Sequence, residues 1–141
     1  MSTVYSVDVE VTVPIFATEV TDRVEDAITN LFPGAEVEQG AGELRGRTHS
    51  LQQFGEQLRK QAILDTARTA FIEGRRGDSF SFALKKQAAF EGVVNFAVGN
   101  PGELGELHVS VRVADPTVDE FIDRLAPQTE DGAPPEDDSW Q

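Results

Sequence analysis

Most of the basic residues of this chain fall within one third of its length. Between positions 45 and 86 there are nine arginine and lysine residues and four acidic ones, so this segment has a net charge of +5. The whole chain of 141 residues has a formal net charge of −13, with 25 acidic residues against 12 basic ones. A cluster of cations inside an acidic chain is typical of a surface that contacts an anionic partner.

The residue types in this segment suit contacts with phosphate groups. Arginine presents a planar fork of donors that matches a phosphate, and glutamine amides can bond base edges or 2′-hydroxyl groups. We therefore predict a surface that binds nucleic acid. Its candidate contact residues are Arg45, Arg47, Arg59, Lys60, Gln61, Arg68, Arg75, Arg76, Lys85, Lys86 and Gln87.

Two other interpretations of the basic segment stay open. Some of the cations could pair with neighbouring acids, as Asp65 and Arg68 could do three positions apart on a helix. Alternatively, the patch could dock an acidic partner protein and have no contact with nucleic acid. Binding of bulk RNA across a salt series separates these interpretations.

No other motif predicts catalysis or metal binding. The glycines at positions 40, 42 and 46 lack the spacing of a phosphate-binding loop, and a predicted strand follows them where such a loop needs a helix. His49 and His108 stand in no metal-ligand spacing, and His108 is expected on one face of a strand. There is no cysteine, and the carboxylates are scattered. We therefore expect no enzymatic activity, no metal and no cofactor.

Composition predicts a single soluble domain in the cytoplasm. The hydrophobic fraction of 39% with nine phenylalanines is sufficient for one packed core. No apolar run is long enough to span a bilayer, and the first residues lack the layout of a signal peptide. The sequence leaves open whether the protein is a monomer or a homodimer.

The excess of acidic residues also predicts adaptation to high salt. Only three of the 12 basic residues are lysines. At about 1 M salt the Debye length falls to about 3 Å, so repulsion between surface carboxylates is screened. We therefore expect folding to become more favourable as KCl rises toward molar concentrations.

The spacing of apolar residues predicts an α+β fold. Segments with period two are interpreted as half-buried strands, and segments with apolar residues three or four positions apart as helices. Short turns join several neighbouring strands, so we expect a mainly antiparallel sheet in a two-layer sandwich, with helices on one face. The predicted order is βαββαβββα. Strands are expected at Val4–Val13, Ala35–Glu38, Glu43–Ser50, Asp78–Leu84, Val93–Val98 and Glu106–Val113, and helices from Thr18 or Thr21 to Leu31, at Leu51–Glu73, and from Pro116 or Thr117 to Leu125.

The C-terminal residues lack this periodicity. From Pro127 onward the chain has three prolines and five acidic residues and no apolar pattern. We therefore expect residues 1–127 to form the domain and residues 128–141 to form a disordered acidic tail.

A pattern of residues spread over positions 4–127 resembles a known family. Its most specific part runs from Lys86 to Phe96, and further matches include Gly46-Arg47, Ser50-Leu51, Phe54, Leu58-Arg59, Gln61, Ile63-Leu64-Asp65, Ala67-Arg68, Arg76-Gly77, Phe82 and Leu84. This pattern is similar to the archaeal uncharacterised-protein family UPF number two hundred and one. The resemblance implies an RNA-binding protein and predicted exosome subunit from an archaeon, here one living at high salt. It also implies a fold similar to ribosomal protein L5.

Overall fold

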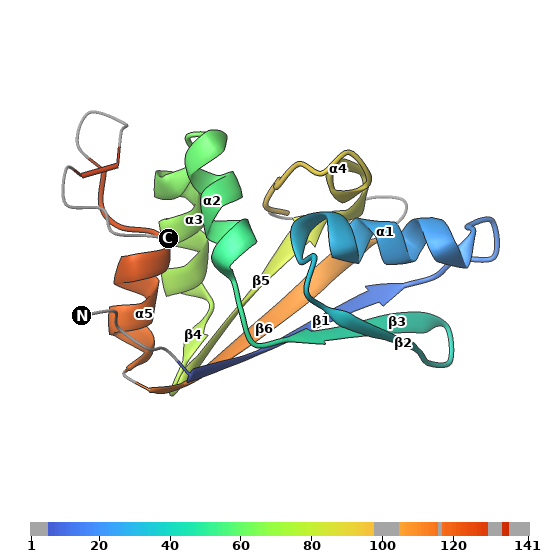
Figure 1. The fold of residues 1–141 in the computed structure, drawn as a ribbon, viewed down its shortest axis with the longest axis horizontal. Coiled ribbons are helices and arrows are strands. Elements are labelled where there is room, and N and C mark those ends of the chain that lie inside the picture. Colours follow the sequence, from blue (N-terminus) through green and yellow to red (C-terminus); the bar gives the residue numbers. More distant parts are fainter. Residues whose placement is uncertain (1–5, 98–104, 116, 130–133, 136–141) are drawn as a thin grey trace.

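The computed structural model describes residues 6–97, 105–115, 117–129 and 134–135 of the chain. These residues form two layers, a six-stranded sheet and five helices that pack on one of its faces (Figure 1). The strands are β1 (Ser6–Pro14), β2 (Glu36–Gln39), β3 (Glu43–Thr48), β4 (Arg75–Arg76), β5 (Ser79–Lys85) and β6 (Glu106–Asp115). The helices are α1 (Thr21–Leu31), α2 (Gln52–Lys60), α3 (Leu64–Glu73), α4 (Lys86–Phe90) and α5 (Val118–Leu125).

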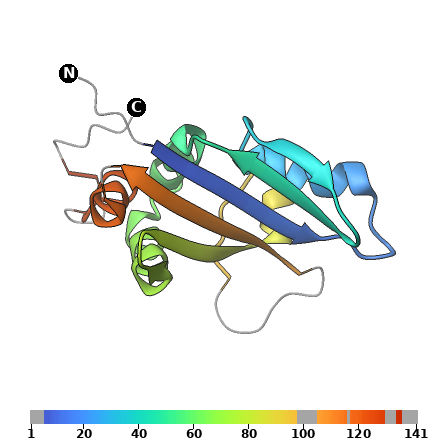
Figure 2. The same ribbon diagram turned by 90° about the horizontal axis from the view of Figure 1, so that it is seen from below.

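The sheet is antiparallel throughout, as predicted. Its strand order is β2-β3-β1-β6-β5-β4, so the longest strands, β1 and β6, lie side by side in the centre (Figure 2). The predicted α+β class and the packing of the helices on one face of the sheet are confirmed.

Alternating side chains give the sheet one apolar face and one polar face. In β1 the four valines at positions 7, 9, 11 and 13 are at most 5% exposed, while the residues between them reach solvent. Against the apolar face pack Phe54 of α2 and Phe71 of α3, whose rings lie 5.6 and 4.9 Å from the ring of Phe82 on β5. The core therefore lies between the sheet and the helices, and the opposite face remains polar.

The prediction of a single helix from Leu51 to Glu73 is wrong. The structure has α2 and α3 instead, separated at residues 61–63, where Ala62 has a φ of 58°. The Gln61 side chain holds this break by donating to the carbonyl of Val94 at 2.9 Å and accepting from its amide at 2.8 Å. The apolar stripe rotates around the predicted helix midway, so two differently directed helices are needed to bury both halves of it.

The chain after β5 also differs from the prediction. Lys86–Phe90 forms the short helix α4, and among residues 93–97 of the predicted strand only Phe96 pairs, in an isolated bridge with Leu84. Val98 lies outside the described residues. The two-residue strand β4, which was not predicted, follows α3 and pairs with the start of β5. The observed order in the described part is therefore βαββααββαβα.

Most of the predicted tail, residues 128–141, lies outside the described residues. Thr129 is described and donates to Asp65 at 2.7 Å, so the chain after α5 passes beside α3. No helix in the described ranges has both the length and the apolar character needed to cross a bilayer.

Candidate nucleic-acid interface

The polar face of the sheet is covered by no helix in the described part of the chain (Figure 2). We call it the open face. Side chains at alternate positions of a strand point to the same face, and directly paired residues share a face. The open face accordingly carries Ser6, Asp8, Glu10 and Thr12 of β1, Glu36 and Glu38 of β2, Glu43, Arg45 and Arg47 of β3, Ser79, Ser81, Ala83 and Lys85 of β5, and Glu106, His108, Ser110 and Arg112 of β6.

One strip of the open face consists mainly of cations and hydroxyl groups, with acids only at its ends, where Glu106 is paired with Lys85 and Asp78 lies 3.5 Å from Arg112. No acidic residue occurs from Ser79 to Lys85 of β5 or from Leu107 to Arg112 of β6. The register pairs Ser79 with Arg112 and Ser81 with Ser110, so their side chains are neighbours across the two strands. We call this strip the β5–β6 track. It consists of Ser79, Ser81, Ala83, Lys85, His108, Ser110 and Arg112, with Arg76 of β4 beside Ser79.

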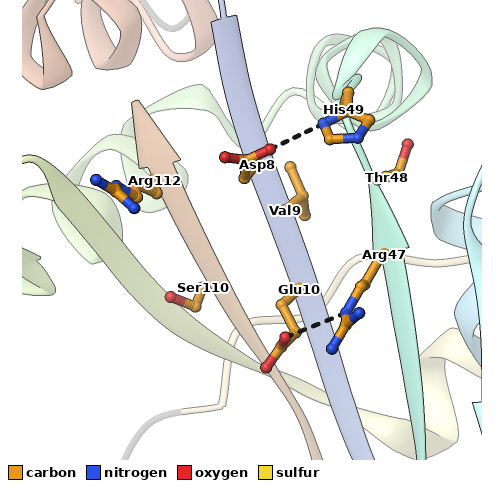
Figure 3. Close-up of a pocket in the computed structure, with 8 residues that line it drawn as sticks. All are labelled: Asp8, Val9, Glu10, Arg47, Thr48, His49, Ser110 and Arg112. Atoms are coloured by element: carbon orange, nitrogen blue, oxygen red, sulfur yellow. Dashed lines mark ion pairs between the residues drawn. The ribbon is translucent and has the colours of Figure 1, made fainter. Parts of the chain in front are cut away.

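The track extends for about 20 Å, since six residue steps of a strand span roughly 3.3 Å each. Two adjoining hollows share Ser110: the first lies mainly on the track, and the second extends from the track over β1 to the end of β3. The first has a volume of about 400 Å³ and is lined by Thr12, Ser81, Phe82, Ala83, His108, Val109 and Ser110. The second has a volume of about 390 Å³ and is lined by Asp8, Val9, Glu10, Arg47, Thr48, His49, Ser110 and Arg112 (Figure 3). The small side chains of the track therefore allow another molecule to approach the sheet closely.

The acids of β1 that border the track have partners in β3 or directly after it, on the side away from the track. Glu10 lies 3.5 Å from Arg47, and Asp8 lies 2.9 Å from Nδ1 of His49 (Figure 3). Glu10 also lies 3.8 Å from Arg45. Nδ1 of His49 is also 3.2 Å from the Val7 carbonyl, and because both neighbours are acceptors, this nitrogen carries the hydrogen. The negative charge beside the track is thus partly compensated.

The ion pairs of the open face are exposed and easily exchanged. The side chains of Arg45, Arg47 and Arg112 are 46%, 60% and 69% exposed, and Arg112 lies 3.5 Å from Asp78. Exposed pairs of this kind contribute about 0–1 kcal/mol. A phosphate can therefore replace a carboxylate as the partner of these guanidinium groups at little cost.

Four of the predicted contact residues lie on the open face. Arg45 and Arg47 come from β3, Lys85 ends β5, and Arg76 stands opposite Ser79. Arg75, next to it, stands opposite the buried Phe80 on the helix side of the sheet. Its guanidinium binds Asp119 of α5 at 2.8 Å.

Two predicted arginines hold the C-terminal end of α5 and do not reach the open face. Arg59 donates to the carbonyls of Gly55, Leu125 and Arg124 at 2.9–3.1 Å. Arg68 donates to the Ala126 carbonyl at 3.0 Å and pairs with Asp123 at 2.8 Å. Both satisfy carbonyl groups that a helix end leaves without partners in the helix.

Lys86 was predicted to contact nucleic acid, but it is fully buried. Its ammonium group donates to the Pro14 carbonyl at 2.6 Å and to both oxygens of Glu19 at 2.8 and 3.1 Å. The ring of Phe16 covers it, with the nitrogen 5.0 Å from the ring centre. In this structure Lys86 therefore fastens α4 to the segment after β1 and has no access to a phosphate.

The remaining predicted residues are not gathered at one place. Lys60 and Gln87 are exposed in the helical layer, at the end of α2 and in α4. Gln61 holds the break between α2 and α3. The single basic strip that was expected to join residues 75–76 with residues 85–86 is thus divided between the two layers.

Six residues of the track were absent from the predicted contact set: Ser79, Ser81 and Ala83 of β5, and His108, Ser110 and Arg112 of β6. The signal that could have found the last three is the alternation in β6, which places these residues at every second position and the buried valines between them. The predicted contact set was chosen from the charge balance of residues 45–86, and β6 lies outside that range.

Comparisons with known proteins agree with this fold. A family model described as RNA binding matches residues 8–114. A UPF0200/UPF0201 protein of Archaeoglobus fulgidus is 42% identical over 130 residues, which cover 92% of this chain and 40% of that relative's length. A UPF0201 protein of Thermococcus onnurineus is 40% identical over 134 residues, which cover 90% of this chain and 96% of that protein.

A solved structure shows the same architecture. The 2.2 Å crystal structure of a UPF0201 protein from Methanococcus jannaschii matches with a TM-score of 0.82 at 32% identity, covering 89% of this chain and 97% of that one. The chain therefore belongs to the UPF0201 family, whose matching model is described as RNA binding.

Proposed function

We propose that this protein binds RNA through the open face, with the β5–β6 track as the main contact surface. The observation that carries this proposal is the absence of acids from the track, in a chain that has 25 of them. The description of the family model as RNA binding supports it. The role is binding without catalysis, in RNA processing or exosome-linked degradation, as the family resemblance implies.

The chemistry of the track suits the sugar-phosphate backbone. Arg76 and Arg112 lie at one end and Lys85 at the other, so cations can hold phosphates at both ends. The hydroxyl groups between them can bond phosphate or ribose oxygens. Arg45 and Arg47 form a second row two strand spacings away, about 10 Å from β6.

Removing one guanidinium from the track is expected to weaken RNA binding. For Arg112→Gln we expect the affinity for RNA to fall about fivefold to tenfold near 0.1 M salt. Each phosphate contact makes log affinity fall by about 0.9 per tenfold rise in salt, so the contribution of one contact at 0.1 M relative to 1 M is of this size. The slope of log affinity against log salt should itself decrease by about one. Fluorescence anisotropy of a labelled structured RNA, titrated over a KCl series, measures both quantities.

The matched control is Arg23→Gln, which removes one exposed guanidinium from α1 in the helical layer. Both variants change the net charge equally, so a general effect of charge would affect them alike. We expect Arg23→Gln to keep the affinity and the salt slope of the unchanged protein. Equal losses in the two variants, or no RNA binding by the unchanged protein at any salt concentration, would contradict the proposal.

A further inference from the structure

In the described part of the chain, the open face carries no phenylalanine, tyrosine or tryptophan ring on which bases could stack, and the one ring in the track is the imidazole of His108. All nine phenylalanines of the chain lie in its described part, and seven are buried in the core. Phe90 packs against that core, and Phe16 follows β1 and covers Lys86. Phe80 and Phe82, the two rings of β5, face the helices and not the track. Sequence-tolerant binding of single strands depends on aromatic side chains that stack with successive bases.

The track offers hydroxyl groups at the positions where a stacking surface would need rings. Ser81 and Ser110 are directly paired at its centre, and Ser79 is paired with Arg112 at its end. A serine hydroxyl both donates and accepts, as the ribose 2′-hydroxyl does. These side chains are thus suited to the sugar edge of RNA and not to the flat faces of its bases.

The shape of the track also favours a rigid ligand. It is a shallow strip two strands wide and about 20 Å long. An A-form RNA duplex presents a wide, shallow minor groove that displays its 2′-hydroxyl groups, together with the phosphates on either side. A single strand would lose conformational freedom on such a strip without stacking energy to offset the loss.

We infer that the RNA bound at the open face is double-stranded, and that the hydroxyl groups of Ser81 and Ser110 contact its ribose 2′-hydroxyls. This inference rests on the proposed RNA-binding function and adds the class of RNA. Recognition is then by duplex shape and backbone, with little dependence on base sequence.

Three labelled probes of one sequence test the inference: a blunt RNA duplex of about 16 base pairs, its unstructured single strand, and the corresponding DNA duplex. We measure the affinity of each probe by anisotropy at one salt concentration. The RNA duplex should bind at least about tenfold more tightly than the single strand, because the bases of the single strand find few rings on the track to stack against. It should also bind more tightly than the DNA duplex, which lacks the 2′-hydroxyls. Single-strand binding equal to or tighter than duplex binding would overturn the inference and leave the proposed function standing. No binding to any probe would overturn both.

A pair of double variants tests the role of the hydroxyl groups. Ser81→Ala/Ser110→Ala should narrow the preference for the RNA duplex over the DNA duplex. The control Thr66→Ala/Thr69→Ala removes two exposed hydroxyl groups from α3 in the helical layer and should leave that preference unchanged. An unchanged preference in the serine variant would contradict the assigned contacts.

Discussion

Replacing Gly74 by alanine is expected to destabilise the fold by about 3 kcal/mol or more, since overpacking a tight site costs about 1–3 kcal/mol and backbone obstruction adds to it. Gly74 ends α3, and a Cβ atom there would lie 1.8 Å from the backbone carbonyl oxygen of Ser81. Its own carbonyl accepts from the Ser81 amide at 3.1 Å, so the helix end and β5 are held together at this point. Urea unfolding followed by circular dichroism measures the loss.

The control for this variant is Gly34→Ala. A Cβ atom at position 34 would have Thr48 Oγ1 at 3.6 Å as its nearest neighbour, an ordinary contact. We therefore expect the unfolding midpoint of Gly34→Ala to stay close to that of the unchanged protein. Similar midpoints for the two glycine variants would show that the helix end and β5 can separate without loss of stability, contrary to the structure.

Replacing Lys86 by methionine is expected to destabilise the protein by about 3–5 kcal/mol, because it leaves a buried carboxylate without its cation. The Glu19 side chain is only 8% exposed and also accepts from the Phe16 amide at 2.9 Å. The substitution removes three hydrogen bonds made by the Lys86 ammonium group. Urea unfolding of the variant measures the change in the free energy of unfolding.

Two further variants separate the buried pair from a general effect of losing a lysine. Lys85→Met removes the neighbouring, exposed lysine and should change stability by less than about 0.5 kcal/mol. Glu19→Gln/Lys86→Met removes both charges and should recover part of the stability lost in Lys86→Met. If Lys85→Met and Lys86→Met are equally stable, the buried ion pair is not what holds α4 in place.

The strands could be predicted from the sequence because alternation of apolar and polar residues is a local signal. It located β1, β3 and β6 to within a few residues, although β3 contains Gly46 and glycine is unfavourable inside a strand. That glycine lies where α1 packs closely, since a Cβ atom would be 3.0 Å from Ile28 Cγ2. The break between α2 and α3 was missed because Gln61 stabilises it through Val94, which is 33 positions away. The likeness to ribosomal protein L5 stays a prediction.

The candidate site was predictable only in part, because charge in a sequence does not distinguish an exposed cation from one that binds the interior. Arg45 and Arg47 alternate along a strand, and that pattern places them on one face. Lys86 looked like its exposed neighbour Lys85, and its partner Glu19 is 67 positions away. Arg59 and Arg68 likewise bind carbonyls near the end of α5, about 60 positions away, which no local pattern indicates.

The central claim, that RNA binds the open face, is tested most directly by following backbone amide resonances of the folded protein during titration with a short RNA duplex. We expect the largest chemical-shift changes along β5 and β6, at Ser79, Ser81, Ser110 and Arg112, with smaller changes at Arg45 and Arg47. The exposed surfaces of α1 and α2 should change little, because they lie in the helical layer on the other side of the sheet (Figure 1). Shift changes confined to the helices, with β5 and β6 unaffected, would contradict the account.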